Sequence, residues 1–329
     1  MPTIRDVARE AGVGVGTVSR VLGNQPRVAP ATRARVEAAI TRLGYRPSPV
    51  ARALSRQRTY SLEVAVPLIT RDFYVEVLRG IEKALDETGY ALLIRTIERA
   101  VDRDRVFAAL ASRERADGAI IVSQAPTTTL LARLAAEDAP AVLVDALHPD
   151  LPSIAIDHEA AAATAVRHLL EQGHRRIALV DHAETPFAQG SPRGRRRGYR
   201  AALVAAGVNP RPSDEIVTEF NAGGGDAALA ALLAQPDPPT AVFAGSDVQA
   251  AGILAATRRL RLRVPEDLAI VGYNDIELAG YLGLTTMRVP MREMGRRGVE
   301  LLFAAIEAPD IVVPQILLTA ALVIRETSQ

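Results

Sequence analysis

The chain has 329 residues, which is long enough for two or three domains, and it contains no cysteine and no tryptophan. Disulfides, thiol catalysis and cysteine-based zinc sites are therefore excluded. The net charge of +1 is uneven: residues 1–60 hold 11 arginines and 3 acidic residues (+8), which leaves 28 basic and 35 acidic residues (−7) for the remainder. A basic segment on an acidic body is typical of a module that binds a polyanion.

Neither a membrane span nor a secretion signal is expected. No apolar run is long enough to cross a membrane, and charged side chains occur throughout residues 1–20. We therefore expect a cytoplasmic protein that has no membrane partner.

The chain begins with two predicted helices joined by a tight turn. The first spans residues 4–11, Gly12 and Val13 form the turn, and the second runs from about Gly14 to Leu22. The outer face of the second helix carries two hydroxyls and an arginine, namely Thr17, Ser19 and Arg20. Two short helices with this outer face suit a helix placed in the DNA major groove.

These residues resemble the DNA-binding head of the lactose-repressor (LacI) family of bacterial transcription regulators. The match comprises Thr3-Ile4, Asp6-Val7-Ala8, Ala11-Gly12-Val13 and the run from Thr17 to Leu22. The predicted third helix spans about Thr32 to Leu43 and ends at Gly44. The resemblance implies an all-α head over residues 1–46 and a hinge helix and linker over residues 47–59.

From residue 61 onward, short apolar runs alternate with amphipathic segments. The helices expected between the runs include Tyr74–Thr88 and Thr127–Glu137. The predicted strands are Leu62–Val66, Ala91–Ile94, Gly118–Val122, Ala141–Val144, Ser153–Ile156, Ile177–Val180, Glu215–Val217, Ala241–Ala244 and Leu268–Tyr273. The alternation predicts two doubly wound, mostly parallel α/β lobes that meet near residue 157, with a ligand cleft at the carboxyl ends of their strands.

The body is also similar to the LacI family, in its periplasmic-binding-protein-like sensor domain. The similar stretches are Asp72-Phe73-Tyr74, Asp117-Gly118, residues 173–177, Gly245-Ser246-Asp247, Val264–Asp267, Val271-Gly272-Tyr273 and Leu284-Thr285-Thr286. The resemblance implies an effector-binding and dimerisation domain over residues 60–329, with the chain crossing back between lobes near residues 288 and 320. It also implies a homodimer bound to a pseudo-palindromic double-stranded operator.

Direct reading of DNA bases falls chiefly on one side chain. Arg20 can bond bidentately to guanine, although a phosphate contact is the alternative. Val15 and Gly16 lie where family members differ, and neither offers a polar side chain. Thr17 and Ser19 are expected at phosphates.

Family position implies further DNA contacts and some departures from the family pattern. Phosphate contacts are expected from Thr3, Thr32 and Tyr45, although Tyr45 can also pack on the third helix. In the hinge, Leu54 is expected to wedge into the minor groove while Ala51 allows close approach. Gly14, Gly23 and Ala29 replace polar residues that are usual in the family, which removes some phosphate bonds.

The effector pocket is assigned by family position to Phe73, Tyr74, Arg195, Phe220 and Asp247. An Asp and an Arg facing each other across aromatic rings suit the hydroxyls of a sugar or sugar derivative. A nucleobase or nucleoside, or a partner protein in place of a small molecule, remains the alternative.

Enzyme motifs are missing from the sequence, so we expect no enzyme activity. There is no Walker loop and no Ser elbow, the five histidines lack metal-ligand spacing, and no catalytic residue, cofactor or metal is expected. The predicted function is that of a sequence-specific repressor whose operator affinity depends on the effector.

Overall fold

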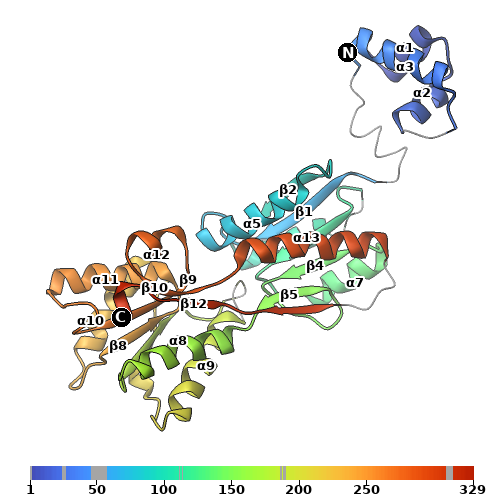
Figure 1. Ribbon diagram of the computed structural model, residues 1–329. Helices are drawn as coiled ribbons and strands as arrows, with labels where there is room; N and C mark the ends of the chain where they lie inside the picture. Colours follow the sequence, from blue (N-terminus) through green and yellow to red (C-terminus); the bar gives the residue numbers. More distant parts are fainter. Residues whose placement is uncertain are drawn as a thin grey trace. The chain divides into compact units, whose positions relative to one another are not determined.

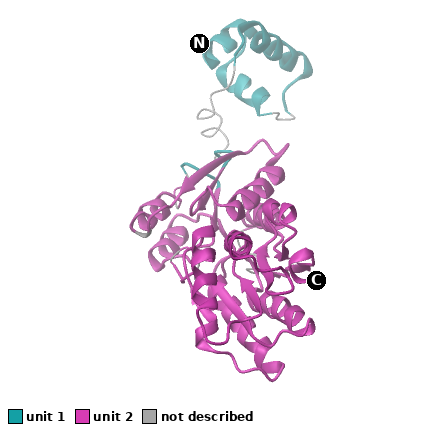
Figure 2. Cartoon of the chain, turned by 90° about the vertical axis from the view of Figure 1, so that its left-hand side faces the viewer, with its two compact units in different colours: residues 1–61, 113–117 teal, residues 62–112, 118–329 magenta. Residues whose placement is uncertain are grey.

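The computed structural model describes residues 2–23, 27–45, 58–110, 112, 114–185, 187, 190–308 and 314–329. The chain divides into two compact units, one formed by residues 1–61 and 113–117 and the other by residues 62–112 and 118–329 (Figure 2). The hinge residues Ala51 and Leu54, for which DNA contacts are predicted, lie outside the described residues.

Three helices form the first unit's helical head: α1 (Ile4–Ala11), α2 (Val15–Leu22) and α3 (Pro30–Leu43). Gly12 and Gly44 end α1 and α3 in the left-handed conformation, with φ of 63° and 60°, which explains glycine at both positions. The helices enclose a small apolar core of Val7, Ala8, Ala11, Val18, Val21, Val36, Ala39 and Tyr45. The predicted helical head is confirmed.

Two helix starts differ by one or two residues from the prediction. Gly14 is the N-cap of α2 and makes no side-chain hydrogen bond, so α2 begins at Val15. The third helix begins at Pro30 and not at Thr32, because proline suits the first helical position, where no backbone donor is needed.

The second unit contains two six-stranded sheets, which define a first and a second lobe (Figure 1). The first-lobe sheet has the order β11-β5-β4-β3-β1-β2, and the second-lobe sheet has the order β12-β10-β9-β8-β6-β7. The strands are β1 (Ser61–Val66), β2 (Ala91–Thr96), β3 (Gly118–Val122), β4 (Ala141–Val144), β5 (Ser153–Ile156), β6 (Ile177–Asp181), β7 (Glu215–Val217), β8 (Ala241–Ala244), β9 (Ala269–Asn274), β10 (Thr285–Arg288), β11 (Gln315–Leu318) and β12 (Ala321–Val323).

Helices cover these sheets, as alternating strands and helices predict. They are α5 (Asp72–Leu85), α6 (Arg103–Leu110), α7 (Thr128–Ala136), α8 (His158–Glu171), α9 (Ser191–Ala205), α10 (Ala222–Leu233), α11 (Asp247–Leu260), α12 (Glu277–Tyr281) and α13 (Met291–Glu307). The strand pairs β1–β3, β3–β4, β6–β8 and β9–β10 are parallel, whereas β12 runs antiparallel to β10. The expected pair of mostly parallel α/β lobes is confirmed.

The chain passes between the lobes three times. It leaves the first lobe after β5, returns after β10 as α13 and β11, and enters the second lobe again at β12. Because β11 pairs with β5 and α13 packs on α5, the C-terminal part of the chain completes the first lobe. These crossings hold the carboxyl ends of both sets of parallel strands beside one another, where the ligand pocket lies.

Close helix packing in the first lobe depends on glycine. A Cβ atom on Gly80 of α5 would lie 2.0 Å from the backbone oxygen of Arg292 in α13. A Cβ atom on Gly295 of α13 would lie 2.1 Å from the backbone oxygen of Val77 in α5. The two helices therefore touch backbone to backbone, which a larger side chain at either glycine would prevent.

Candidate DNA-binding surface and ligand pocket

The predicted recognition helix α2 has an apolar inner face and an open outer face. Val18 and Val21 are buried in the head core, whereas Val15 is 41% exposed and Gly16 and Arg20 are exposed. The Arg20 side chain lies back along its own helix: Nε donates to the Gly16 backbone oxygen at 3.2 Å, and Nη2 donates to Thr17 Oγ1 at 3.4 Å. Within the described part of the chain no carboxylate pairs with Arg20, so its charge is available to DNA.

Two of the predicted phosphate contacts, Thr3 and Tyr45, also have structural roles in the head. Thr3 begins α1 with a capping box, in which its backbone N–H donates to Asp6 at 2.9 Å and its hydroxyl accepts from the Asp6 backbone N–H at 3.4 Å. Tyr45 is 8% exposed and packs in the head core after the end of α3. Thr32, in the first turn of α3, and Ser19 on α2 are half-buried. Their contacts with DNA stay predictions.

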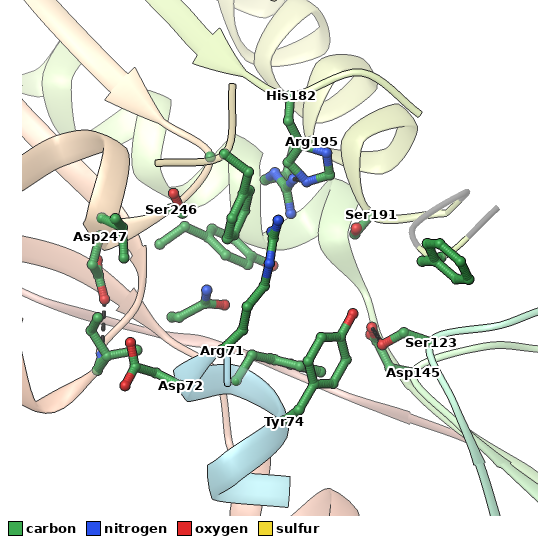
Figure 3. A pocket seen from close by; sticks show the side chains of 18 of the residues that line it. Arg71, Asp72, Tyr74, Ser123, Asp145, His182, Ser191, Arg195, Ser246 and Asp247 are labelled. Carbon is green, nitrogen blue, oxygen red and sulfur yellow. Dashed lines mark hydrogen bonds between the residues drawn. The ribbon is translucent and has the colours of Figure 1, made fainter. Parts of the chain in front are cut away.

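A cavity of about 230 Å³ lies at the carboxyl ends of the parallel strands of both lobes (Figure 3). Each lobe supplies residues from the segments that follow its strands, as the topology of doubly wound sheets predicts. The lining comprises Thr70, Arg71, Asp72, Phe73, Tyr74, Ser123, Asp145, His158, His182, Phe187, Ser191, Arg195, Phe220, Gly245, Ser246, Asp247, Val248, Tyr273, Asn274 and Ile276. All five predicted effector residues are therefore brought into one pocket.

Arg195 and Asp247 both line the pocket, and each is held by a different partner within the protein. Nε and Nη2 of Arg195 donate to the two carboxylate oxygens of Asp181, at 2.9 and 2.8 Å. Both side chains are buried. A buried guanidinium requires a counterion, and Asp181 at the end of β6 supplies it. Burial opposes ionisation of Asp181, but Arg195 outweighs burial and holds the pKa of Asp181 below its ordinary value.

Both carboxyl oxygens of Asp247 already accept hydrogen bonds from other residues of the protein. Its Oδ1 accepts from Thr286 Oγ1 at 2.5 Å, and its Oδ2 accepts from the Ile276 backbone N–H at 2.8 Å. Burial raises the pKa of Asp247 to about 7 in spite of these bonds. Ser246, not Asp247, is the N-cap of α11, with its hydroxyl accepting from the Gln249 backbone N–H.

A second polar group in the pocket was missed by the sequence reasoning. Ser123 Oγ donates to Asp145 Oδ2 at 2.6 Å, and His158 bridges the lobes, with Nε2 at 3.3 Å from Asp145 Oδ1 and Nδ1 at 2.7 Å from the Tyr273 hydroxyl. The Tyr74 phenol faces the same group, and burial raises its pKa above the ordinary value. Ser123 directly follows β3 and Asp145 directly follows β4. A polar residue directly after a predicted strand is therefore the sequence signal that could have identified both as pocket residues.

Aromatic rings and a neutral histidine form the other end of the pocket. The rings of His182 and Phe220 meet edge to face with centroids 4.8 Å apart. His182 Nδ1 lies 2.8 Å from the Ala183 backbone oxygen, and its Nε2 lies 3.3 Å from Arg195 Nη2. Burial and the charge of Arg195 lower the pKa of His182, so the ring is neutral and its Nε2 accepts. Such a pocket offers apolar faces together with donors and acceptors for hydroxyl groups.

The described residues contain neither a metal-binding cluster nor a membrane-spanning helix. Among them, no group of three or more His, Cys, Asp or Glu side chains could hold a metal ion. In the same part of the chain, no helix has the length and apolar character needed to cross a membrane.

A small helical head carrying an exposed arginine, followed by two α/β lobes around a pocket, defines a DNA-binding, ligand-sensing regulator. Comparisons with known proteins agree. Residues 3–48 match the "Bacterial regulatory proteins, lacI family" and residues 166–328 match the "Periplasmic binding protein-like domain". The ribose operon repressor of Escherichia coli (strain K12) is 34% identical over 99% of each chain. The chain belongs to the LacI family of bacterial transcription regulators.

Solved structures of transcription regulators are similar along nearly the whole chain. The lac repressor dimer bound to operator and the anti-inducer ONPF matches with a TM-score of 0.87 and 29% identity, covering 99% of each chain. The complex of the transcriptional regulator CelR with cellobiose matches with a TM-score of 0.73 and 32% identity, covering 99% of this chain and 100% of the other.

Proposed function

We propose that the protein is a transcriptional repressor whose affinity for operator DNA is controlled by a sugar or sugar derivative bound between the two lobes. The observation that carries this proposal is the pocket itself, which joins apolar rings to a buried set of hydroxyl-binding groups at the carboxyl ends of both sheets. A relative that represses a ribose operon and another that holds cellobiose favour a sugar over a nucleobase.

The proposed division of labour follows the chain. Residues 1–46 bind the operator, residues 47–59 form the hinge, and residues 60–329 bind the effector and pair in a homodimer. In the head, Arg20 reads a base, Val15 and Gly16 approach the groove, and Thr3, Thr17, Ser19, Thr32 and Tyr45 contact phosphates. In the hinge, Leu54 wedges into the minor groove and Ala51 allows close approach. The protein acts in the cytoplasm, where its operator lies.

In the pocket, we assign two kinds of contact. Phe73, Tyr74 and Phe220 supply apolar faces. Arg195 is held by Asp181 and stacks 5.0 Å from the Tyr273 ring centroid, so it presents a fixed donor edge to the ligand. Asp247 supports the wall, and it donates or accepts according to its protonation state. A ligand that binds one arrangement of the lobes more tightly than another stabilises that arrangement. The operator affinity can change by no more than the difference between the two ligand-binding free energies.

Operator binding tests the assignment of the head. The full chain should bind a pseudo-palindromic duplex as a dimer, with an affinity that falls steeply as salt rises, because the basic head neutralises several phosphates. Deleting residues 1–59 should abolish binding in a fluorescence anisotropy titration. Analytical ultracentrifugation of the truncated protein should still show a dimer. Retained operator binding by the truncated protein would overturn the assignment.

A further inference from the structure

Arg71 is a cation inside the pocket that the function described so far does not use. It lies in the first lobe, directly before α5, where backbone bonds from Arg71 N to the Leu68 oxygen (2.9 Å) and from Tyr74 N to the Arg71 oxygen (2.9 Å) fix its position. Its side chain extends from the start of α5 into the pocket, toward His182 and Arg195 (Figure 3). A charged side chain is thus aimed at the space the effector occupies.

The Arg71 guanidinium is held by an aromatic ring and not by an acid. Its Cζ lies 4.3 Å from the ring centroid of Phe220, a second-lobe residue. Among the described residues, no carboxylate forms an ion pair with Arg71; the neighbouring Asp72 is exposed, and Asp247 is bonded to Thr286 and Ile276. Arg195, by contrast, is neutralised by Asp181. Arg71 therefore carries the uncompensated positive charge of this end of the pocket.

Stacking leaves the donor edge of Arg71 free. When a planar guanidinium lies over a ring, its N–H groups point sideways in its own plane, where a carboxylate or phosphate can accept two of them at once. Burial and Arg195 chiefly lower the pKa of His182, and the charge of Arg71 makes a smaller contribution in the same direction. At the other end, Asp145 and Ser123 form an acidic, hydroxyl-binding group. The pocket is therefore bipolar.

We propose that the effector is an anionic sugar derivative, either a sugar phosphate or a sugar acid, whose oxyanion is bound by Arg71 and whose hydroxyls face Asp145, Ser123 and His158. This proposal rests on the proposed function and specifies the ligand class of the same pocket. The chemistry shared by both candidates is a pair of anionic oxygens at one end of a polyhydroxy compound.

Matched ligands test the proposal by isothermal titration calorimetry on the full-length protein. The probes are two sets, each with one carbon skeleton: ribose, ribose 5-phosphate and ribonate, and glucose, glucose 6-phosphate and gluconate. In at least one set we expect a charged member to bind roughly 10- to 100-fold more tightly than its neutral parent. The charged member with the larger increase in affinity over the neutral parent shows whether the pocket prefers a phosphate or a carboxylate.

Variants assign the gain to Arg71. Arg71→Gln should reduce the ratio of charged to neutral affinity to about 1. The matched control Arg133→Gln removes one exposed arginine of α7, away from the pocket, and should leave the ratio unchanged. The proposal is overturned if the neutral parent binds as tightly as the charged members, or if Arg71→Gln weakens all members of a set equally, which would make Arg71 a latch between lobes.

Inorganic phosphate provides a probe that does not depend on the sugar skeleton. Phosphate should raise the melting temperature of the wild type above that in chloride of equal ionic strength, and it should do so less for Arg71→Gln. If no sugar binds and this difference is missing, the proposal is wrong. A charged sugar that binds through Arg71 but leaves operator affinity unchanged would instead contradict the proposed function alone.

Discussion

At the scale of single residues, the same types of side chain have different duties in head and pocket. Arg20 lies on the outer face of α2, where no carboxylate of the described residues pairs with it, whereas Arg195 is buried against Asp181. Family position predicted that both bind ligands, but only the structure shows what holds each one. An arginine with a buried counterion is a rigid part of the wall, while an exposed arginine is free to reorient toward DNA.

The Arg20 assignment predicts a loss of sequence preference. Arg20→Ala should weaken binding to the cognate operator by roughly 1–3 kcal/mol and relax the preference at one base pair, because a bidentate contact to guanine is lost. Anisotropy titrations with the operator and its single-base variants measure both effects. Thr17→Ala is the control, and it should weaken cognate and scrambled DNA alike. Equal weakening of both DNAs by Arg20→Ala would make Arg20 a phosphate contact.

The Asp247 carboxyl predicts a pH dependence of stability. Its pKa is raised to about 7 in the folded protein from an ordinary value of 3.8, so the folded state holds its proton more tightly than the unfolded state. The stability that this more tightly held proton contributes is fully present below about pH 4. It is lost as the pH rises through 7, and it does not change further above that pH. Asp247→Asn should therefore lose less stability between pH 4 and 8 than the wild type does, as urea denaturation at several pH values can measure. Parallel curves would show that Asp247 has an ordinary pKa.

At the scale of elements, the sequence predicted the strands and helices whose apolar residues recur with a clear period. All nine predicted strands occur, because four or more buried apolar residues in a row, or an apolar run between turn residues, leave little ambiguity. β10, β11 and β12 were not predicted as strands. They are three or four residues long, β10 carries two buried threonines, and β11 pairs with β5 about 160 residues earlier. Such pairing depends on tertiary contacts that periodicity does not report.

The pocket shows the same limit. The five residues assigned by family position share one cavity, but their hydrogen-bond partners were not foreseen. Asp181 and Thr286 stand next to Arg195 and Asp247 only after the second lobe has folded, since 14 and 39 residues separate them along the chain. Arg71, Asp145 and His158 follow or precede elements whose ends had been predicted, so the strand-end rule could have found them.

Packing of α13 on α5 gives an element-scale prediction. Gly295→Ala should destabilise the protein because the new Cβ would meet the Val77 backbone oxygen at 2.1 Å. Overpacking costs roughly 1–3 kcal/mol, which exceeds the gain of about 1 kcal/mol from replacing glycine in a helix. Gly280→Ala on α12 is the matched control, since its Cβ meets nothing within 4 Å, and it should be neutral or stabilising. Equal urea midpoints for the two variants would contradict the close backbone contact.

At the scale of the whole molecule, three crossings of the chain join the two lobes, and His158 at the first crossing lines the pocket. One buried apolar cluster contains residues from both lobes, for example Val66 and Tyr273. His158, at the first crossing, bonds to Asp145 of the first lobe and Tyr273 of the second. A ligand that contacts both lobes therefore changes the free energy of their relative arrangement, which is the quantity that effector control requires.

The most direct test measures operator affinity with the pocket empty and occupied. A ligand that binds residues 60–329 is first identified by thermal shift among sugars, sugar phosphates and sugar acids. The dissociation constant of the full-length protein for its operator is then measured by anisotropy with and without saturating ligand. Control by the effector requires a change of about 5-fold or more, as is typical of allosteric coupling. An unchanged dissociation constant with the pocket saturated would contradict it.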